Sequence, residues 1–562
     1  MKIIKCISCF FLLLCLLSPS HASDNSKQLR ATRVSHNDIV RGEIEKRIGI
    51  LRSNGNLTVH SVQISSMTVL PALYERFDFR PVWVNEESVG QLILALETIE
   101  DDGLESSDYH LSLLKKLRAQ LIVEEPVSPS LLAEFDLLLS DSLVRLGYHL
   151  LIGKVDPVEL DTNWNMDRTV VELDQLIQMS RTAIADGSVA GFIQNMRPQA
   201  KVYNQLRSAL AHYRDIQVKG GWGQIAKGLT LKRGMNDSRV VSLRKRLIIT
   251  NDMADDNQDD PSFDSILEQA VKHFQKRHAL VSDGIVGKNT LQALNRTALE
   301  KINQIRVNLE RVRWVMHDLP EKFVLVDIAG FRVHYFADKV SVFETRSQVG
   351  TTYRKTPVFK SQITYLELNP TWTVPKTIFL EDLLPKIRRN PDYLRERGLR
   401  VITYKGESVD VKTIDWSRYP RRGFPYLLRQ DPGPNNALGQ IKFMFPNEQS
   451  VYLHDTPSRS LFDAKKRAFS SGCVRIEDPF QLAELLLDDD KWSQQELMEV
   501  IESRETRQIS LQQPVSILLL YWTVKIADDG SVVFINDIYE RDQSVLAGLN
   551  AQFRFRKRPI VK

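Results

Sequence analysis

Two short segments of the chain carry residue types that could work together as a nucleophile and a base. In residues 451–457 (VYLHDTP), apolar and aromatic residues alternate as in a half-buried strand, and His454 comes at its end. In residues 468–479 (AFSSGCVRIEDP), Cys473 follows a glycine. A free thiol with a pKa of about 8.5 is mostly protonated at neutral pH, and a neighbouring imidazole can accept its proton. The 19-residue step from His454 to Cys473 is long enough for two adjacent strands to bring them together. We therefore interpret Cys473 as a nucleophile and His454 as its base.

The residues around the thiol indicate a rigid turn. Gly472 allows a tight turn that brings backbone N–H groups close to the sulfur, and we expect N–H groups around Gly472 and Cys473 to hold an oxyanion. Asp478 can cap the helix that follows, with Pro479 at its first position. Asp455 directly follows the histidine, but adjacent strand residues point to opposite faces. The sequence therefore leaves open which group orients the imidazole.

The first residues predict a signal peptide, residues 1–22. Two lysines precede an apolar core, Ile7–Leu17, and Ser20-His21-Ala22 offers a small-x-small cleavage site. This core is too short for the roughly 20 residues of a spanning helix, although an uncleaved anchor is the alternative. Three of the four cysteines lie in this segment, so we expect an exported, periplasmic protein with Cys473 as its one thiol and no internal disulfide. A later apolar run, Val515–Val524, is typical of a buried strand, and we expect no stable membrane span.

Charge and composition exclude some classes of protein. The chain of 562 residues has a formal net charge of +5, which is nearly neutral for its length and argues against a nucleic-acid partner. With 43% hydrophobic residues it can build substantial cores, and its length predicts three or four domains.

Periodicity predicts an α+β multidomain protein. Residues 23–220 carry apolar residues at three- and four-residue spacing, which predicts an N-terminal α-helical scaffold domain without a catalytic constellation. Residues 229–297 form a compact three-helix unit, and residues 300–562 begin with a helix and continue as a β-rich domain. Near the C-terminus, Val515–Ile526 and Ser531–Ile535 flank Asp-Asp-Gly, which predicts a hairpin.

The three-helix unit resembles the peptidoglycan-binding domain found beside many bacterial wall enzymes. The similarity rests on a helical Val-x-x-Leu start, on the pair Phe274-Gln275, and on the closing segment 283–294, which reads DGIVGKNTLQAL. The resemblance implies peptidoglycan, both glycan and stem peptides, as the partner of the chain.

The Cys–His segments resemble the signature of the L,D-transpeptidase catalytic domain, in which a histidine precedes Ser/Thr-His-Gly-Cys and often an arginine two positions on. Ser470, Gly472, Cys473 and Arg475 match it, whereas Ser471 replaces the motif histidine. The resemblance implies a β-rich, sandwich-like catalytic domain that uses no metal or other cofactor. It also implies cleavage of a tetrapeptide stem before its terminal D-alanine and transfer of the acyl group to a neighbouring stem, giving a 3→3 cross-link. Many members are acylated by carbapenems.

Residues 376–430 are an insertion rich in Lys and Arg, with helical periodicity. The flanking segments 369–375 (NPTWTVP) and 432–439 (PGPNNALG) also look like the family. The insertion resembles the substrate-capping lid of large Gram-negative members. The alternative is a surface segment that only exposes a charged face to solvent.

Two alternatives to the transpeptidase remain from sequence. An L,D-carboxypeptidase would use the same nucleophile with water as the acceptor. The non-enzymatic alternative is a peptidoglycan-binding scaffold, although intact His454, Gly472 and Cys473 argue against it. A metal site at His454 and Asp455 is disfavoured because no second ligand lies at suitable spacing. Arg475 could bind a substrate carboxylate or brace the turn.

Overall fold

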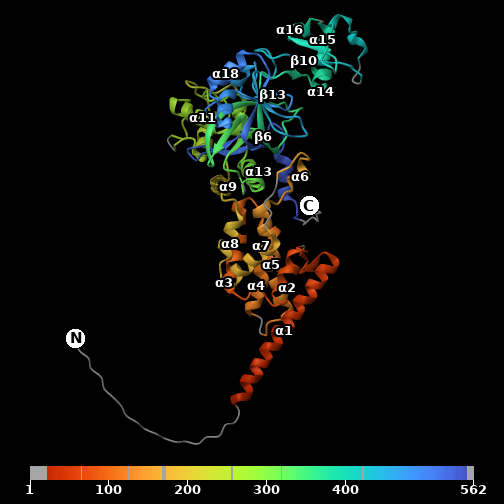
Figure 1. The fold of residues 1–562 in the computed structure, drawn as a ribbon. Helices are drawn as coiled ribbons and strands as arrows, with labels where there is room; N and C mark the ends of the chain where they lie inside the picture. Colours follow the sequence, from red (N-terminus) through yellow and green to blue (C-terminus); the bar gives the residue numbers. More distant parts are fainter. Residues whose placement is uncertain are drawn as a thin grey trace, which may run out of the picture.

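The computed structural model describes residues 22–64, 66–123, 126–166, 172–254, 257–317, 319–390, 392–419 and 423–553, apart from the side chains of residues 22–35. The molecule is elongated, with a helical stalk, a β-rich body and a small lobe at the far end (Figure 1). The predicted signal peptide lies outside the described residues except for Ala22. Within the described residues, no helix combines the length and apolar character needed to cross a membrane.

The stalk is the predicted helical region. Its central helix, α5 (Pro129–Ile152), begins where the Ser128 side chain accepts a hydrogen bond from Leu131 N–H, with proline at the first helical position. Asp136 on α5 accepts hydrogen bonds from the backbone N–H groups of Val82 and Trp83, which fixes a loop against the helix. The other elements are α1 (Ala22–Asn54), β1 (Leu57–Val59), β2 (Val62–Ile64), α2 (Val69–Arg76), α3 (Glu86–Glu97), η1 (Ile99–Asp102), η2 (Ser106–Tyr109), α4 (Leu111–Val123), α6 (Pro157–Leu160), α7 (Leu173–Ala185), α8 (Val189–Met196) and α9 (Lys201–Val218).

The three-helix unit comprises α10 (Arg239–Ile249), α11 (Ser265–Arg277) and α12 (Lys288–Leu294). Gln275 on α11 fixes the turn that leads into α12. Its side chain accepts a hydrogen bond from Gly284 N–H at 2.8 Å and donates to Asp283 and to the Ile285 carbonyl at 2.8 and 3.0 Å. Gly284 has a φ of +75°, which favours glycine. The Phe-Gln pair and the Asp-Gly turn noted in the sequence therefore belong to one structural unit.

The body is a nine-stranded sheet that follows helix α13 (Ala298–Val315). The strand order is β13-β5-β14-β12-β11-β6-β15-β3-β4, and β5 also pairs with β4, so the sheet closes on itself. Helices α17 (Pro479–Leu487) and α18 (Gln494–Glu502) share one hydrophobic core with it. The α+β class is confirmed. The strands are β3 (Phe323–Asp327), β4 (Arg332–Ala337), β5 (Val340–Gly350), β6 (Phe359–Leu368), β11 (Ile441–Met444), β12 (Leu453–His454), β13 (Ala468–Ser470), β14 (Val474–Ile476) and β15 (Arg507–Leu520).

The predicted insertion, residues 376–430, forms the small lobe at the top of Figure 1 together with the preceding residues 372–374. It has its own sheet, in the order β7-β10-β8-β9, and its own hydrophobic core around Phe379, Ile387 and Leu428. The lobe therefore folds around side chains of its own. Its elements are β7 (Trp372–Thr373), α14 (Lys376–Ile378), the π-helix η3 (Phe379–Leu383), α15 (Leu384–Arg389), α16 (Tyr393–Glu396), β8 (Leu399–Ile402), β9 (Ser408–Val409), η4 (Val411–Thr413), η5 (Trp416–Arg418) and β10 (Leu427–Gln430).

The C-terminal segment returns from the sheet to α13. The run predicted as one hairpin arm, Val515–Ile526, is split: β15 ends at Leu520, and the hairpin is made by β16 (Val524–Ile526) and β17 (Val532–Phe534). The break comes at Thr523, whose N–H donates to Asn308 on α13 and whose hydroxyl donates to Asp542 at the start of α19 (Asp542–Asn550). Buried polar groups that need partners on α13 thus draw the chain out of the sheet.

We predict that Gln275→Leu weakens the three-helix unit by about 1–3 kcal/mol, because the Gly284 N–H loses its buried acceptor. Hydrogen exchange of residues 275–294 in the full chain measures this. Gln269→Leu on the exposed side of α11 is the matched control. Unchanged protection in Gln275→Leu would show that the turn does not depend on this side chain.

Candidate active site

The pairing of β12 with β14 brings His454 and Cys473 to one face of the sheet. The two strands are parallel, with Leu453 opposite Val474 and His454 opposite Arg475. Val474 N–H donates to the Tyr452 carbonyl at 3.1 Å, which extends the ladder by one residue. Side chains alternate between faces, and opposite residues share a face. Cys473 therefore lies beside Tyr452 and diagonally across from His454.

A row of polar side chains crosses the sheet through the histidine. Gln348 on β5 is opposite Arg475, and His454 is opposite Lys442 on β11, which is opposite Glu367 on β6. The neighbouring row points to the other face and consists of Leu453, Val474, Phe443 and Leu366, all fully buried. The apolar row fixes the register because a slip by one residue would bury the polar row.

His454 is held in one tautomer by a backbone group. The side chain is 3% exposed, and its Nδ1 lies 2.5 Å from the Asp455 carbonyl oxygen. A carbonyl oxygen only accepts, so Nδ1 carries the proton and Nε2 is the basic nitrogen. Burial and the charge of Arg475 lower the pKa of His454 to about 3, against the opposing effect of the Asp455 and Leu438 carbonyls. The imidazole is therefore neutral at physiological pH, and the group left open by the sequence is the Asp455 backbone.

Cys473 is half-buried beside Tyr452. Burial raises the pKa of the thiol above its ordinary value, while hydrogen bonds from Tyr452 and the charges of Arg475 and Lys442 oppose that rise. The sulfur also lies 3.8 Å from the Ser450 carbonyl oxygen. With the thiol pKa raised and the imidazole pKa lowered, the resting pair is neutral.

The turn that carries the thiol is closed by Ser470, which is 3% exposed. Its hydroxyl accepts a hydrogen bond from Gly472 N–H at 3.1 Å and donates to the Cys473 carbonyl at 2.5 Å. Gly472 has a φ of +120°, in the region that favours glycine. Because Gly472 N–H is already bonded, the expectation that it could help to hold an oxyanion does not fit this arrangement.

Ser471 connects the turn to the 376–430 insertion through Arg354. Arg354 donates to the Ser471 hydroxyl at 2.9 Å and forms ion pairs with Glu381 at 2.8 Å and Asp382 at 2.5 Å. Both acids lie on η3, a π-helical segment at the base of the insertion. Such segments are frequent at functional sites.

Arg475 follows Cys473 by two residues on β14 and points to the same face of the sheet. Its Nη1 donates to Gln348 at 3.3 Å, and its Nε is buried without a hydrogen-bond partner in the described part of the chain. Burial lowers the pKa of Arg475, while the charges of Cys473 as a thiolate and of Tyr452 oppose that lowering. Arg475 thus retains an unused donor close to the sulfur.

Several residues near the thiol were not singled out as functional from sequence. Tyr452 and Lys442 could have been found, because alternation along β12 and pairing with β11 place them on the face of His454. Arg354 and Thr356 lie more than a hundred residues from Cys473 in the sequence and carry no local signal. Among the described residues, no group of three or more His, Cys, Asp or Glu side chains could hold a metal ion.

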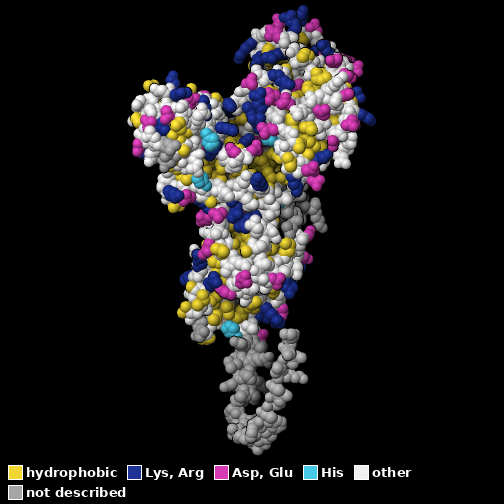
Figure 2. Space-filling model, turned by 90° about the vertical axis from the view of Figure 1, so that its left-hand side faces the viewer, with side chains coloured by type: hydrophobic (Ala, Val, Ile, Leu, Met, Phe, Trp, Pro, Cys, Tyr) yellow, Lys and Arg dark blue, Asp and Glu magenta, His cyan; other side chains and the backbone are white. Residues whose placement is uncertain are grey.

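A cleft of about 2400 Å³ lies elsewhere, between the three-helix unit, α13 and strands β3 and β4. Figure 2 shows a hollow with hydrophobic side chains on this side of the molecule. Neither His454 nor Cys473 lines the cleft, so it is distinct from the candidate active site.

Comparisons with known proteins match three parts of the chain to known families. Residues 68–210 match a scaffold domain, residues 236–294 match a putative peptidoglycan-binding domain, and residues 321–501 match the L,D-transpeptidase catalytic domain. A putative L,D-transpeptidase of Haemophilus influenzae is 37% identical over 248 residues, which cover 44% of this chain and 50% of that protein. The chain thus spans about half the length of this curated relative.

Two solved structures are also similar to the chain, at low scores. An L,D-transpeptidase from Xylanimonas cellulosilytica is 14% identical with a TM-score of 0.18, and the match covers 52% of this chain and 99% of that one. An L,D-transpeptidase from Stackebrandtia nassauensis is 13% identical with a TM-score of 0.19, covering 53% and 96%. The similarity of residues 321–501 to the L,D-transpeptidase catalytic domain therefore rests on the family match and on the curated relative.

We predict that the rate of Cys473 alkylation by iodoacetamide rises with pH and has its midpoint above that of free cysteine. Only the thiolate reacts, and burial raises the thiol pKa, so the thiolate fraction at neutral pH is smaller than in a free thiol. The rate is expected to show no additional pH-dependent step between pH 5 and 7, because His454 stays neutral in that range. A fast rate that is constant from pH 6 upward would contradict a neutral resting pair.

Proposed function

We propose that this chain, which carries an L,D-transpeptidase catalytic domain, is a cysteine-dependent peptidoglycan transpeptidase that forms 3→3 cross-links between stem peptides. The observation that carries the proposal is the parallel pairing of β12 with β14, which puts Cys473 and His454 on one sheet face inside the matched domain. A thiol beside a neutral imidazole that carries its proton on Nδ1 has the parts needed for acyl transfer.

The first half-reaction transfers the donor stem to the enzyme. The thiol proton passes to Nε2 of His454 as Sγ of Cys473 attacks the carbonyl carbon before the terminal D-alanine. A C–S bond forms, and the carbonyl electrons move to oxygen. When the tetrahedral intermediate collapses, the C–N bond breaks, and the imidazolium gives its proton to the departing D-alanine amine.

The second half-reaction transfers the acyl group to a neighbouring stem. The acceptor side-chain amine gives a proton to His454 and attacks the thioester carbon. A C–N bond forms, the C–S bond breaks, and the sulfur takes the proton back. If water takes the place of the amine, the product is a tripeptide, as in the carboxypeptidase alternative.

Arg475 is the proposed contact for the terminal carboxylate of the donor stem. It lies beside Cys473 with an unpartnered Nε, and an arginine fork suits a carboxylate. A carboxylate that reaches this partly exposed guanidinium would add hydrogen bonds to it.

The 376–430 insertion is proposed to close over the peptide as a lid. Arg354 connects its base directly to the turn before the nucleophile. Closure would exclude water and favour the amine acceptor over hydrolysis.

We place the mature protein in the periplasm, associated with the cell wall. This proposal is supported by the signal-peptide pattern in the sequence and by the match of residues 236–294 to a putative peptidoglycan-binding domain.

We predict that the mature protein converts a disaccharide-tetrapeptide into a cross-linked dimer that lacks one D-alanine, and that Cys473→Ala abolishes both the dimer and the acyl adduct. His454→Ala is expected to slow adduct formation by about 10²–10⁴, because the thiol loses its base. Mass spectrometry of enzyme and products measures all three, with thermal melting to establish that each variant is folded. Dimer formation by Cys473→Ala would contradict the proposal, and tripeptide without dimer would identify a carboxypeptidase.

We predict that Arg354→Gln raises the ratio of tripeptide to cross-linked dimer about fivefold. The two partly exposed ion pairs to the insertion are worth about 1 kcal/mol together, so their loss shifts the lid toward open states. Arg400→Gln, which removes an exposed ion pair between the insertion and Asp431 directly after it, is the matched control. An unchanged ratio in Arg354→Gln would show that this contact does not couple the insertion to the outcome.

A further inference from the structure

The loop of residues 351–356 contacts the three residues before Cys473 one after another. Thr351 N–H donates to the Ser470 carbonyl at 2.9 Å, and Arg354 donates to the Ser471 hydroxyl. The Thr356 hydroxyl donates to the Gly472 carbonyl at 2.8 Å. The loop therefore acts as a template for the turn that presents the nucleophile.

The contact at Gly472 has a consequence for the next N–H group. In a trans peptide the carbonyl and the N–H point in opposite directions, so a fixed Gly472 carbonyl also fixes the Cys473 N–H. Glycine can adopt backbone conformations that other residues rarely reach, so the turn by itself does not select one orientation of this peptide unit. The Thr356 hydroxyl supplies that selection.

Other groups of the turn are already engaged. The Ser470 hydroxyl is bonded to both Gly472 N–H and the Cys473 carbonyl. The Cys473 N–H, opposite the carbonyl that Thr356 holds, is the donor of the turn that can meet an oxyanion.

We infer that Thr356 is a positioning residue for the oxyanion hole, because it orients the Gly472–Cys473 peptide so that Cys473 N–H faces the developing charge. The inference rests on the proposed function, since it takes Cys473 as an acyl acceptor. Thr356 touches neither the substrate nor the sulfur and acts through the peptide unit.

Thr356 is held in turn by Tyr539, which lies beyond the matched catalytic domain. Thr356 N–H donates to the Tyr539 hydroxyl at 3.2 Å, and that hydroxyl donates to the Gly350 carbonyl at 2.6 Å. Gly350 N–H donates back to the Thr356 hydroxyl at 2.9 Å, which closes a ring of three hydrogen bonds. All three residues are buried.

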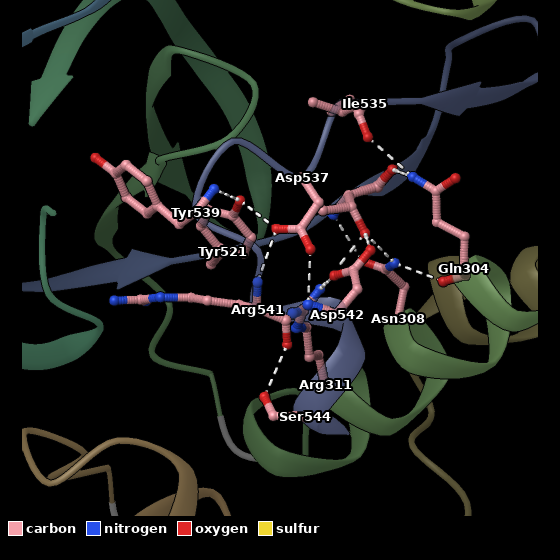
Figure 3. Close-up of polar contacts among 11 residues, drawn as sticks. Gln304, Asn308, Arg311, Tyr521, Ile535, Asp537, Tyr539, Arg541, Asp542 and Ser544 are labelled. Atoms are coloured by element: carbon pink, nitrogen blue, oxygen red, sulfur yellow. Dashed lines mark hydrogen bonds and ion pairs between the residues drawn. The ribbon is translucent and has the colours of Figure 1, made fainter. Parts of the chain in front are cut away.

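The segment that carries Tyr539 is anchored to α13 (Figure 3). Tyr539 N–H donates to the Tyr521 hydroxyl, which donates to Asp537. Asp537 accepts from the N–H of Asp542, and Asp542 forms an ion pair with Arg311 on α13 at 2.6 Å. The support of the catalytic turn therefore extends through the C-terminal segment to the helix that precedes the sheet.

The inference separates two reactions of the same sulfur. Acylation by a carbapenem passes through a tetrahedral oxyanion and needs the N–H donor, whereas alkylation by iodoacetamide is a displacement at a saturated carbon and forms no oxyanion. A residue that serves only the oxyanion hole must therefore affect acylation and spare alkylation. A residue that merely maintains the fold would affect both.

The experiment compares the two rates in the full chain for wild type, Thr356→Val and Thr356→Ser, by intact mass. Thr356→Val keeps the shape and loses the hydroxyl, and we expect acylation to fall about 10²-fold with alkylation within about twofold. Thr356→Ser keeps the hydroxyl and is expected to restore acylation. Tyr539→Phe, which leaves the Thr356 hydroxyl in place, is expected to lower acylation by less than Thr356→Val does. It also tests the inference if Thr356→Val does not fold.

Tyr74→Phe is the control for loss of a buried tyrosine hydroxyl, because its hydroxyl bonds to Asp136 and Ser140 inside the stalk. It should leave both rates unchanged. Normal acylation by Thr356→Val or Tyr539→Phe, or an equal fall in both rates, would overturn the inference while the proposed function stands. A wild-type protein that alkylates but never acylates would overturn both.

Discussion

The structure of the candidate site depends on the register of two short parallel strands. Pairing of Leu453 with Val474 buries both side chains and puts His454, Cys473 and their polar neighbours on the opposite face. A slip by one residue would exchange the faces, placing charged side chains in the core. The same apolar row that stabilises the body of the protein therefore aligns Cys473 with His454.

The surroundings of Cys473 and His454 determine the protonation states of these two side chains at rest. Burial raises the pKa of the thiol and lowers that of the imidazole, and the nearby cations Arg475 and Lys442 stabilise a thiolate while they disfavour an imidazolium. The proton thus rests on sulfur at neutral pH. A neutral resting pair limits the oxidation and side reactions to which an exposed thiolate is prone.

Much of this arrangement could be predicted from local sequence. Alternation around His454, the glycine before Cys473, and the Phe-Gln and Asp-Gly signals of the three-helix unit are contained in short segments, and periodicity was sufficient for the helical stalk. Long-range contacts could not be predicted. Arg354, Thr356 and Tyr539 reach the turn only through the order of the strands and the return of the C-terminal segment to α13. The C-terminal hairpin forms as predicted, but its first arm begins only at Val524, because the backbone partner of Thr523 lies on a helix more than two hundred residues earlier.

The central claim is that the sheet holds a neutral thiol beside a neutral imidazole whose proton is on Nδ1. Nitrogen NMR of the protein labelled in its histidine rings, with His454 assigned by comparison with His454→Gln, measures this directly. The account predicts a neutral His454 ring, protonated at Nδ1, that does not titrate between pH 5 and 8. An imidazolium at pH 7 that becomes neutral in Cys473→Ala would instead show a resting ion pair and contradict the account.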